Sequence, residues 1–239
     1  FAIVPKIAAV GIIYRFCLEP FNNFYSEWSQ IIIFLSIASM FLGATAAIAQ
    51  NNIKRLLAYS SIGHVGYLLI GLAAANSEGI KGVCIYMSIY IVMNVAIFAI
   101  ILSLKANNKY IEKIFDLTGL SKHKPLLSLC VAIIMLSMAG IPPFAGFFGK
   151  FYIFVAALKA NLVLLAILGV ISSVISAFYY LKIIKIMYFD EAENFQFKNL
   201  MSAQSSIILI FSILFITLFI LYPSFLTSIS SSISVDYFR

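Results

Sequence analysis

The sequence predicts an all-α integral membrane protein with about seven transmembrane helices, one of them broken. The first reason is composition, because 63% of the 239 residues are hydrophobic and only 10% are charged. Soluble domains carry roughly 45–50% apolar and about 25% charged residues. The second reason is a mean hydropathy of +1.05. The third is that apolar stretches long enough to cross a bilayer recur along the chain.

Each predicted span is a stretch of about 20 mainly apolar residues, the length needed to cross roughly 30 Å of hydrocarbon. The spans cover residues 1–18, 29–50, 54–75, 81–104, 125–158, 161–188 and 204–223. The fifth is far longer than a bilayer requires, and it contains Gly140, Pro142 and Pro143. Successive prolines remove backbone donors and clash with the preceding turn, so we expect a helix break there. A break at membrane depth must be buried in protein or line a wet cavity.

Basic residues are distributed unequally between the two ends of these spans. The connections after the second, fourth and sixth spans contain Lys54, Arg55, Lys105, Lys109, Lys113, Lys122, Lys124, Lys182, Lys185 and Lys198. The opposite side contains Arg15, Lys81, Lys159 and Arg239. By the positive-inside rule, the loop 105–124 lies on the cytoplasmic or matrix side and the C-terminus on the outer side. We therefore read the formal charge of +7 as topology bias and expect no nucleic-acid partner.

Two lysines, Lys6 and Lys150, fall inside predicted spans. A charged lysine at the bilayer centre costs roughly 2.5–3.5 kcal/mol on insertion scales, so it requires a partner or a function. Desolvation favours the neutral amine and allows proton exchange near neutral pH, which a proton relay requires. The alternative is that each side chain reaches to the interface. That alternative is harder for Lys150, which follows the double-proline break.

His64 is the only histidine inside a predicted span. Ser60 precedes it by four positions and Tyr67 follows by three, so the three side chains lie near one helix face. A histidine with polar neighbours at this depth can pass protons. The alternative is a neutral histidine that hydrogen-bonds neighbouring helices. Other polar residues in the spans are compatible with a hydrated path: Asn94, Ser172, Ser173, Ser176, Tyr179 and Tyr180.

No motif for a cofactor or a metal is found in the sequence. A phosphate-binding loop, a dinucleotide glycine fingerprint and a nucleophile elbow are all missing. Cys17, Cys84 and Cys130 lie far apart in apolar stretches, which indicates buried small side chains and neither a metal site nor a disulfide framework. Any energy source must therefore be a partner or an ion gradient.

Long motifs in this chain resemble the antiporter-like membrane subunits of respiratory complex I. They are the stretch NIKRLLAYSSIGH at 52–64 and the stretch LSMAGIPPFAGFFGKFY at 136–152. Shorter support comes from VPKIAA at 4–9 and SAFYYLK at 176–182. The sequence Lys150-Phe151-Tyr152 resembles membrane subunit 2 in particular, since the sister subunit 4 has a glutamate at the corresponding place.

The resemblance implies an inverted-repeat fold with charged residues buried along the membrane midplane. In that fold, 1–18 is the last helix of the first repeat, 29–188 the second repeat, 204–223 a closing transmembrane helix and 224–239 an outer-side tail. Lys6 is then the connecting lysine, His64 a relay residue and Lys150 the lysine of the broken helix. Lys54 and Tyr59 belong to a family motif and are further candidates for proton transfer.

The resemblance also implies a function and partners. The chain is expected to translocate protons in NADH:ubiquinone oxidoreductase, with NADH, FMN, iron–sulfur clusters and ubiquinone in partner subunits and no cofactor bound by this chain. A separate chain is expected to supply the first repeat, unless the sequence is a fragment. The residue usage suits an AT-rich organelle genome, hence the mitochondrial inner membrane; the alternative is a bacterial plasma membrane. Two other functions remain open: a subunit of a multisubunit cation/proton antiporter, and a scaffold that carries no protons.

Overall fold

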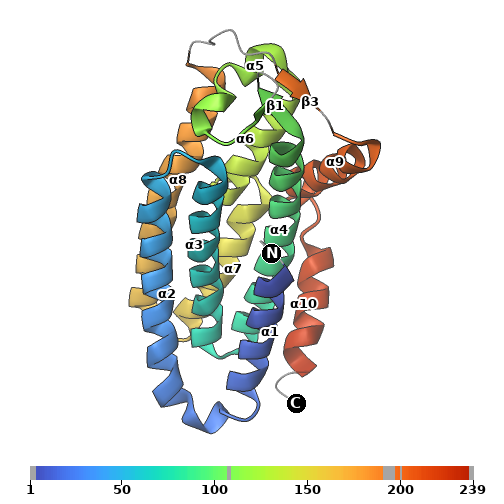
Figure 1. Ribbon diagram of the computed structural model, residues 1–239. Coiled ribbons are helices and arrows are strands. Elements are labelled where there is room, and N and C mark those ends of the chain that lie inside the picture. The colour runs from blue at the N-terminus through green and yellow to red at the C-terminus, as the bar shows by residue number, and fades with distance from the viewer. Residues whose placement is uncertain (1–3, 107–108, 191–196, 200, 237–239) are drawn as a thin grey trace.

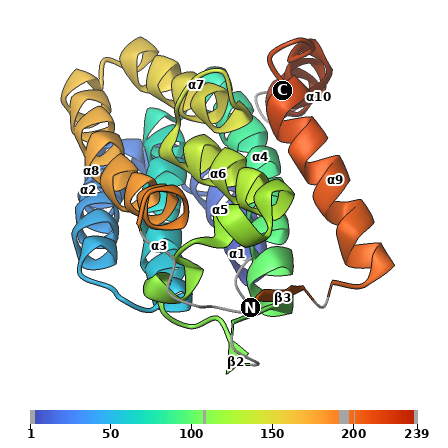
Figure 2. The same cartoon turned by 90° about the horizontal axis from the view of Figure 1, so that it is seen from above.

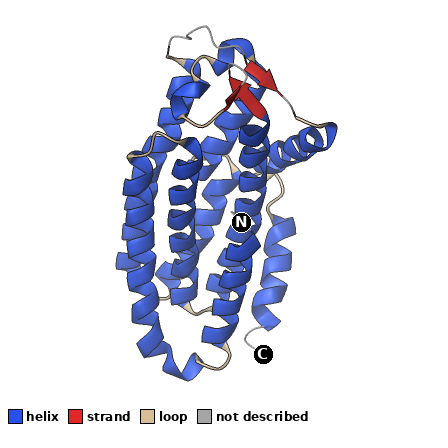
Figure 3. Ribbon diagram, in the orientation of Figure 1, coloured by secondary structure: helices blue, strands red, loops and turns tan. Residues whose placement is uncertain are grey.

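The computed structural model describes residues 4–106, 109–190, 197–199 and 201–236. Long helices run side by side through most of it, and short elements gather at one end (Figures 1 and 3). The bundle contains α1 (Val4–Leu18), α2 (Tyr25–Ile48), α3 (Ile53–Ala74), α4 (Ser77–Ser103), α6 (Pro125–Ala139), α7 (Ala145–Lys159) and α8 (Val163–Tyr188). The prediction of a mainly helical membrane protein is thus confirmed at this level.

Four described helices are long and apolar enough to cross a membrane. They are Asn22–Ile48, which joins the short helix η1 (Asn22–Phe24) to α2, and then α3, α4 and α8. Two shorter apolar helices, α6 and α9 (Ala203–Leu218), do not reach that length. Length and composition of the described helices therefore do not establish all seven predicted spans, because the fifth is divided and the last has 16 residues.

The helix starts follow from capping residues. Asn52 precedes α3, and its side chain accepts hydrogen bonds from the backbone N–H groups of Lys54 and Arg55 at 3.0 and 3.1 Å. Asn76 does the same for Gly79 before α4, at 2.7 Å. Such oxygens satisfy donors that a helix end leaves without partners.

The helices α2 and α3 approach each other at small residues. A Cβ atom added to Gly43 would lie 2.5 Å from the backbone nitrogen of Gly63, so only glycine fits at this contact. Nearby, Ser36 donates a hydrogen bond to the carbonyl of Gly66 at 2.7 Å. Small residues and serine hydroxyls are typical of close helix packing in membranes.

The predicted break of the fifth span is present. The helix α6 ends at Gly140, whose φ of 85° lies in the left-handed region where glycine is favoured. The chain then passes through Pro142 and Pro143, which are joined by a cis peptide bond, and α7 begins at Ala145. The two half-helices differ in their main neighbours, since α7 packs most extensively on α4 and α3 and α6 on α8, whereas α4, α8 and α9 contact both.

A small antiparallel sheet lies at the end of the bundle that carries most basic residues. Its strand order is β2 (Lys109–Tyr110), β1 (Leu104–Ala106), β3 (Phe197–Asn199). In the register, Lys105 faces Tyr110 on one side and Lys198 on the other. The helices η2 (Ile114–Leu117) and α5 (Leu120–His123) complete this cap. The sheet joins the segment after α4 to the segment before α9, a pairing that the sequence analysis did not predict.

The last two helices differ from the predicted closing span and tail. The helix α9 runs across the side of the bundle, while α10 (Ser224–Asp236) runs along it (Figures 1 and 2). Both pack against α4. Residues 224–236 therefore form a helix where a tail was expected. Ser230 and Ser234 of α10 are buried, whereas Phe225, Ile229 and Ile233 are exposed.

Candidate functional site

Lys150 lies in α7, one and a half turns after the helix break, and only 4% of its surface is exposed. Its Nζ donates hydrogen bonds to the carbonyls of Met138 and Ala139, at 3.2 and 2.8 Å, and to Ser173 Oγ at 2.8 Å. The ring of Tyr67 lies 5.0 Å from the same nitrogen. The side chain thus turns back toward the interrupted helix, and does not extend to an interface.

The end of α6 supplies the negative partner of this lysine. Met138 and Ala139 are the last residues of α6, where carbonyl groups have no intrahelical donors and carry the negative end of the helix dipole. Among the residues that the structure describes, no carboxylate lies within ion-pair distance of Lys150. The ammonium is therefore balanced by backbone and hydroxyl dipoles, with an aromatic face beside it.

His64 is held between two tyrosine hydroxyls. Its Nδ1 is hydrogen-bonded to Tyr86 Oη at 2.5 Å, and its Nε2 to Tyr180 Oη at 3.0 Å. Tyr180 Oη also contacts Ser60 Oγ at 2.5 Å. A neutral imidazole donates through one nitrogen and accepts through the other. Because both nitrogens have hydroxyl partners, a proton can be taken up on one side of the ring and released on the other.

His64 and Lys150 line the same small cavity, which is packed too tightly to admit a water molecule. The other lining residues come from α3, α6 and α8: Ser60, Gly63, Tyr67, Met138, Ser176, Tyr179 and Tyr180. The expected grouping of Ser60, His64 and Tyr67 on one face of α3 is confirmed. The cavity places an amine, an imidazole and several hydroxyls together inside the bundle.

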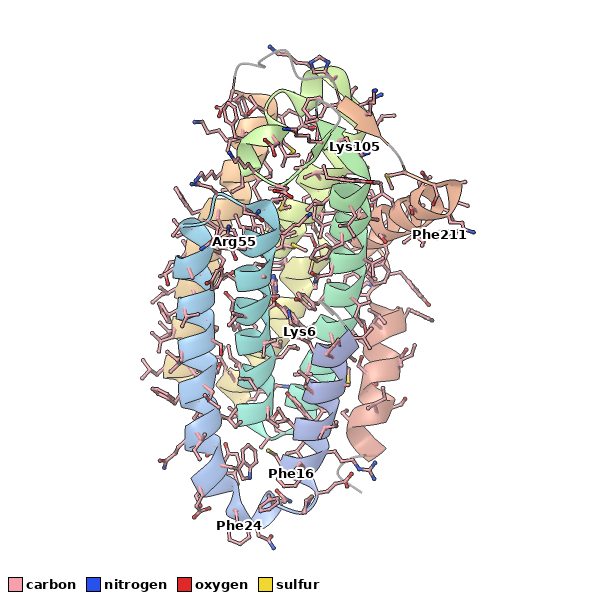
Figure 4. The ribbon with its side chains drawn as sticks, viewed as in Figure 1. Lys6, Phe16, Phe24, Arg55, Lys105 and Phe211 are labelled. Atoms are coloured by element: carbon pink, nitrogen blue, oxygen red, sulfur yellow. The ribbon has the colours of Figure 1, made fainter. Side chains whose placement is uncertain are left out.

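Lys6 contacts α3 at Ser61, on the side next to the one that carries Ser60 and His64. It is half-buried at mid-height of the bundle, and its Nζ donates a hydrogen bond to Ser61 Oγ (Figure 4). Ser61 in turn donates to the carbonyl of Ala58 at 2.5 Å. Ser61 directly follows Ser60 in α3. Lys6 therefore contacts the residue next to the one whose hydroxyl belongs to the cluster around His64.

Lys54 and Tyr59 are not brought into this cluster. Lys54 lies in the first turn of α3, at the basic end, and Tyr59 packs as a half-buried side chain at the edge of the core. Figure 4 shows Arg55 and Lys105 at the same upper end, away from Phe16 and Phe24. These two candidates therefore lie apart from Lys6, His64 and Lys150.

Two tyrosines of α4 were missed by the sequence analysis. Tyr86 holds His64, and the ring of Tyr90 lies 4.9 Å from the imidazole, centroid to centroid. Tyr90 Oη is buried and has no hydrogen-bond partner among the described atoms. The signal was available, because transmembrane tyrosines usually occupy the interfaces. A pair at i and i+4 in the middle of a span indicates a polar interior.

No group of three or more His, Cys, Asp or Glu side chains that could hold a metal occurs within the described ranges. The groups of the site that can exchange protons are an amine and an imidazole.

Residues 1–176 match the family model described as NADH:quinone oxidoreductase/Mrp antiporter, TM. The chain belongs to this family.

Relatives within the family are identical to this chain at about half of the aligned positions. Subunit N of the NADH-quinone oxidoreductase of Pelagibacter ubique (strain HTCC1062) is 54% identical over 236 residues, which are 98% of this chain and 50% of the relative. The same subunit of Rhodospirillum rubrum is 52% identical over 224 residues, 94% of this chain and 46% of the relative. The chain thus spans about half the length of the curated relatives it matches.

Solved structures of the family have the same fold. A chain of respiratory complex I from Thermus thermophilus with bound Aureothin superposes with a TM-score of 0.73 at 28% identity, covering 83% of this chain and 45% of that one. A chain of the Mrp complex from Dietzia sp. DQ12-45-1b gives a TM-score of 0.84 at 20% identity, covering 98% and 51%. The second likeness concerns the fold alone. The predicted membership of the antiporter-like family is confirmed.

Proposed function

We propose that the chain is a proton-translocating membrane subunit of an NADH:quinone oxidoreductase, respiratory complex I. In this proposal NADH, FMN, iron–sulfur clusters and ubiquinone belong to partner subunits, and this chain contributes to the enzyme only the movement of protons. Lys6, His64 and Lys150 carry the protons. Lys54 and Tyr59 lie apart from the cavity, so no transfer step is assigned to them.

The observation that carries the proposal is the environment of Lys150. A buried amine held by the carbonyls that end a half-helix can exist with or without its proton, because none of its partners needs to titrate. His64 lines the same cavity and has a hydroxyl at each ring nitrogen. A scaffold with no protons to move would gain nothing from an amine in this position, because burial of a charge is costly.

The finer assignments belong to the same proposal. The chain corresponds to membrane subunit 2, residues 29–188 form the second repeat of an inverted pair, and residues 204–223 are the closing transmembrane helix. Its other partners are complex I membrane subunits, including a polypeptide that supplies the first repeat. The membrane is a mitochondrial inner membrane or a bacterial plasma membrane, with the basic cap on the matrix or cytoplasmic side. The C-terminus is placed on the outer side.

Replacement of Lys150 tests the proposal directly. The variant Lys150→Ala, produced in the intact complex, should assemble but lose most NADH-driven proton pumping, by about ten-fold or more. The measurement is the quenching of a pH-sensitive dye in membrane vesicles. Lys159→Ala is the matched control, because it removes a lysine from the same helix at an exposed position. Full pumping by Lys150→Ala would leave the scaffold as the better explanation.

Native electrophoresis separates the complex I assignment from a cation/proton antiporter. Mildly solubilised membranes are stained in the gel for NADH dehydrogenase, and the band that contains this chain is identified by mass spectrometry. Migration with a large NADH-oxidising assembly supports the proposal, and peptides matching the first half of the relatives identify the chain that supplies it. Migration in a small assembly without NADH activity would favour the antiporter.

A further inference from the structure

A groove opens on the side of the bundle between the first turn of α6 and the crossing helix α9. Its volume is about 450 Å³, and it lies close to the basic cap, since His123 of α5 is one of its lining residues. The lining residues come from three segments: His123, Lys124, Pro125, Leu126, Leu127, Cys130, Met201, Ser206, Leu209 and Ile210. None of them belongs to the cavity around Lys150. The groove exists because α9 crosses the bundle and does not lie along it.

The walls of this groove are apolar and turned outward. Leu126 is 79% exposed and Ile210 58% exposed, so each would present a large bare surface in water. In a membrane protein such a surface meets lipid chains or another protein. The groove is therefore shaped for an extended apolar group that enters from the bilayer side.

The rim of the groove is positively charged. Lys124 is exposed, and no ion pair of its side chain occurs among the described residues. Lys124 also precedes Pro125, the first residue of α6, where backbone N–H groups are free of intrahelical partners and the helix dipole is positive. His123 lies beside it on the rim. A basic side chain, a helix start and an apolar slot thus converge at one point.

We propose that this groove binds an anionic phospholipid, with one acyl chain in the slot and the phosphate at Lys124 and the start of α6. The basic cap supports this occupant, since the leaflet on the side rich in Lys and Arg is the one that carries anionic lipids. A free phosphate would use the rim but not the apolar walls. The proposal rests on membrane embedding and on the orientation proposed above, and it is independent of proton transfer.

Photo-crosslinking in nanodiscs tests the proposal. The intact complex is placed in phosphatidylcholine discs that contain a photoactivatable phosphatidylglycerol or, in parallel, phosphatidylcholine with the same photoactive acyl chain. Mass spectrometry then locates labelled peptides. We expect the phosphatidylglycerol probe to label residues 125–130 and 206–210 more strongly than the phosphatidylcholine probe.

Three variants separate charge from shape. Lys124→Gln should lower phosphatidylglycerol labelling of these peptides by about five-fold and leave phosphatidylcholine labelling unchanged, because it removes one cationic contact. Cys130→Phe should lower labelling by both probes, since it fills the slot. Lys109→Gln removes the same charge on β2, outside the groove, and should change neither. Native electrophoresis confirms that each variant is assembled before labelling.

Three results would overturn the inference. Equal labelling by the two probes, or unchanged phosphatidylglycerol labelling in Lys124→Gln, would remove the anionic headgroup from the site. Crosslinks from these peptides to a neighbouring subunit, without lipid labelling, would show that protein fills the groove.

Discussion

At the scale of single residues, the partners of Lys150 distinguish this site from an ordinary buried ion pair. An ammonium in a low-dielectric interior loses its hydration, and a carboxylate is its usual compensation. Here the compensation is two carbonyls and a hydroxyl at 2.8–3.2 Å. The neutral amine keeps the same neighbours and leaves no opposite charge stranded. Both protonation states are therefore accommodated without a counter-ion.

The two tyrosines of α4 should respond differently to loss of their hydroxyls. In Tyr86→Phe, a ring nitrogen of His64 loses its partner at 2.5 Å. An unsatisfied buried group costs about 1–3 kcal/mol, so we expect about ten-fold weaker proton pumping and a lower temperature of inactivation. Pumping rate and thermal inactivation of the complex are the measurements.

Tyr90→Phe is the matched control for this change. The hydroxyl of Tyr90 makes no hydrogen bond with the described atoms. Its removal should therefore change the free energy of unfolding by no more than about 0.5 kcal/mol and leave the temperature of inactivation near that of the parent. Equal losses in the two variants would contradict a specific role of the bond between Tyr86 and His64.

The sequence predicted the charged and titratable residues of the site better than their partners. A lysine or histidine inside an apolar span is recognisable from composition alone, and Lys150, His64 and Ser60 do line one cavity. The tyrosine partners depend on how α4 and α8 are rotated, which no single-helix pattern specifies. Lys54 and Tyr59 were selected by motif, and a motif does not indicate which side of a helix faces the cavity.

At the scale of elements, the break between α6 and α7 was predictable because Gly140 and two prolines dictate it locally. What the sequence could not supply was the use of the break, since the contact between Lys150 and the α6 carbonyls depends on the tertiary fold. For the apolar stretch 204–223, the sequence predicted a helix but not that this helix crosses the side of the bundle (Figure 2). Hydropathy counts apolar residues, but it carries no information on the direction of the helix.

Gly140→Ala tests the geometry of the break. A Cβ atom at this position would lie 3.0 Å from Lys150 Cδ and 3.2 Å from its Nζ. The left-handed backbone conformation adds about 1–2 kcal/mol for a residue with a side chain. We expect displacement of the lysine and a severe loss of pumping in an assembled complex.

Gly11→Ala is the control, because nothing lies within 4 Å of a Cβ atom there and alanine favours the helix. Normal pumping by Gly140→Ala, measured in the same vesicle assay, would mean that the position of Lys150 does not depend on this turn.

The close contact of α2 and α3 gives an asymmetric pair of variants. Gly43→Ala places a methyl group against the backbone of α3 and should destabilise the protein by about 1–3 kcal/mol. Gly63→Ala, on the facing helix, meets its nearest atom only at 3.9 Å and should be tolerated. The measurement is the yield and melting temperature of the assembled complex. If the two variants behaved alike, α2 and α3 would not be packed at this distance.

At the scale of the whole molecule, most basic residues gather at one end, as the alternation of spans predicted. Arg55 and Lys105 lie at that end, far from Phe16 and Phe24 at the other (Figure 4). The cap at this end, to which Lys105 belongs, includes a sheet assembled from segments about 90 positions apart. Such a pairing is invisible to local patterns, so the position of the charges was predictable and the cap was not.

Cysteine labelling tests the orientation of the molecule. In a background where Cys17, Cys84 and Cys130 are replaced by alanine, Lys109→Cys and Asn23→Cys place single thiols at opposite ends. A membrane-impermeant maleimide added from the outer side should label Asn23→Cys and spare Lys109→Cys until the membrane is opened. The reverse pattern would invert the proposed topology.

The half-helices α6 and α7 differ in their main neighbours, since α6 packs most extensively on α8, and α7 on α4 and α3. A carbonyl group does not titrate at any physiological pH, so the attraction that α6 exerts on Lys150 is set by distance alone. A shift of α8 relative to α3 and α4 that moved α6 away from α7 would stretch the 2.8 Å contact and weaken the hold on the charged amine. At this break, a movement of helices outside the site would therefore change how strongly Lys150 holds its proton.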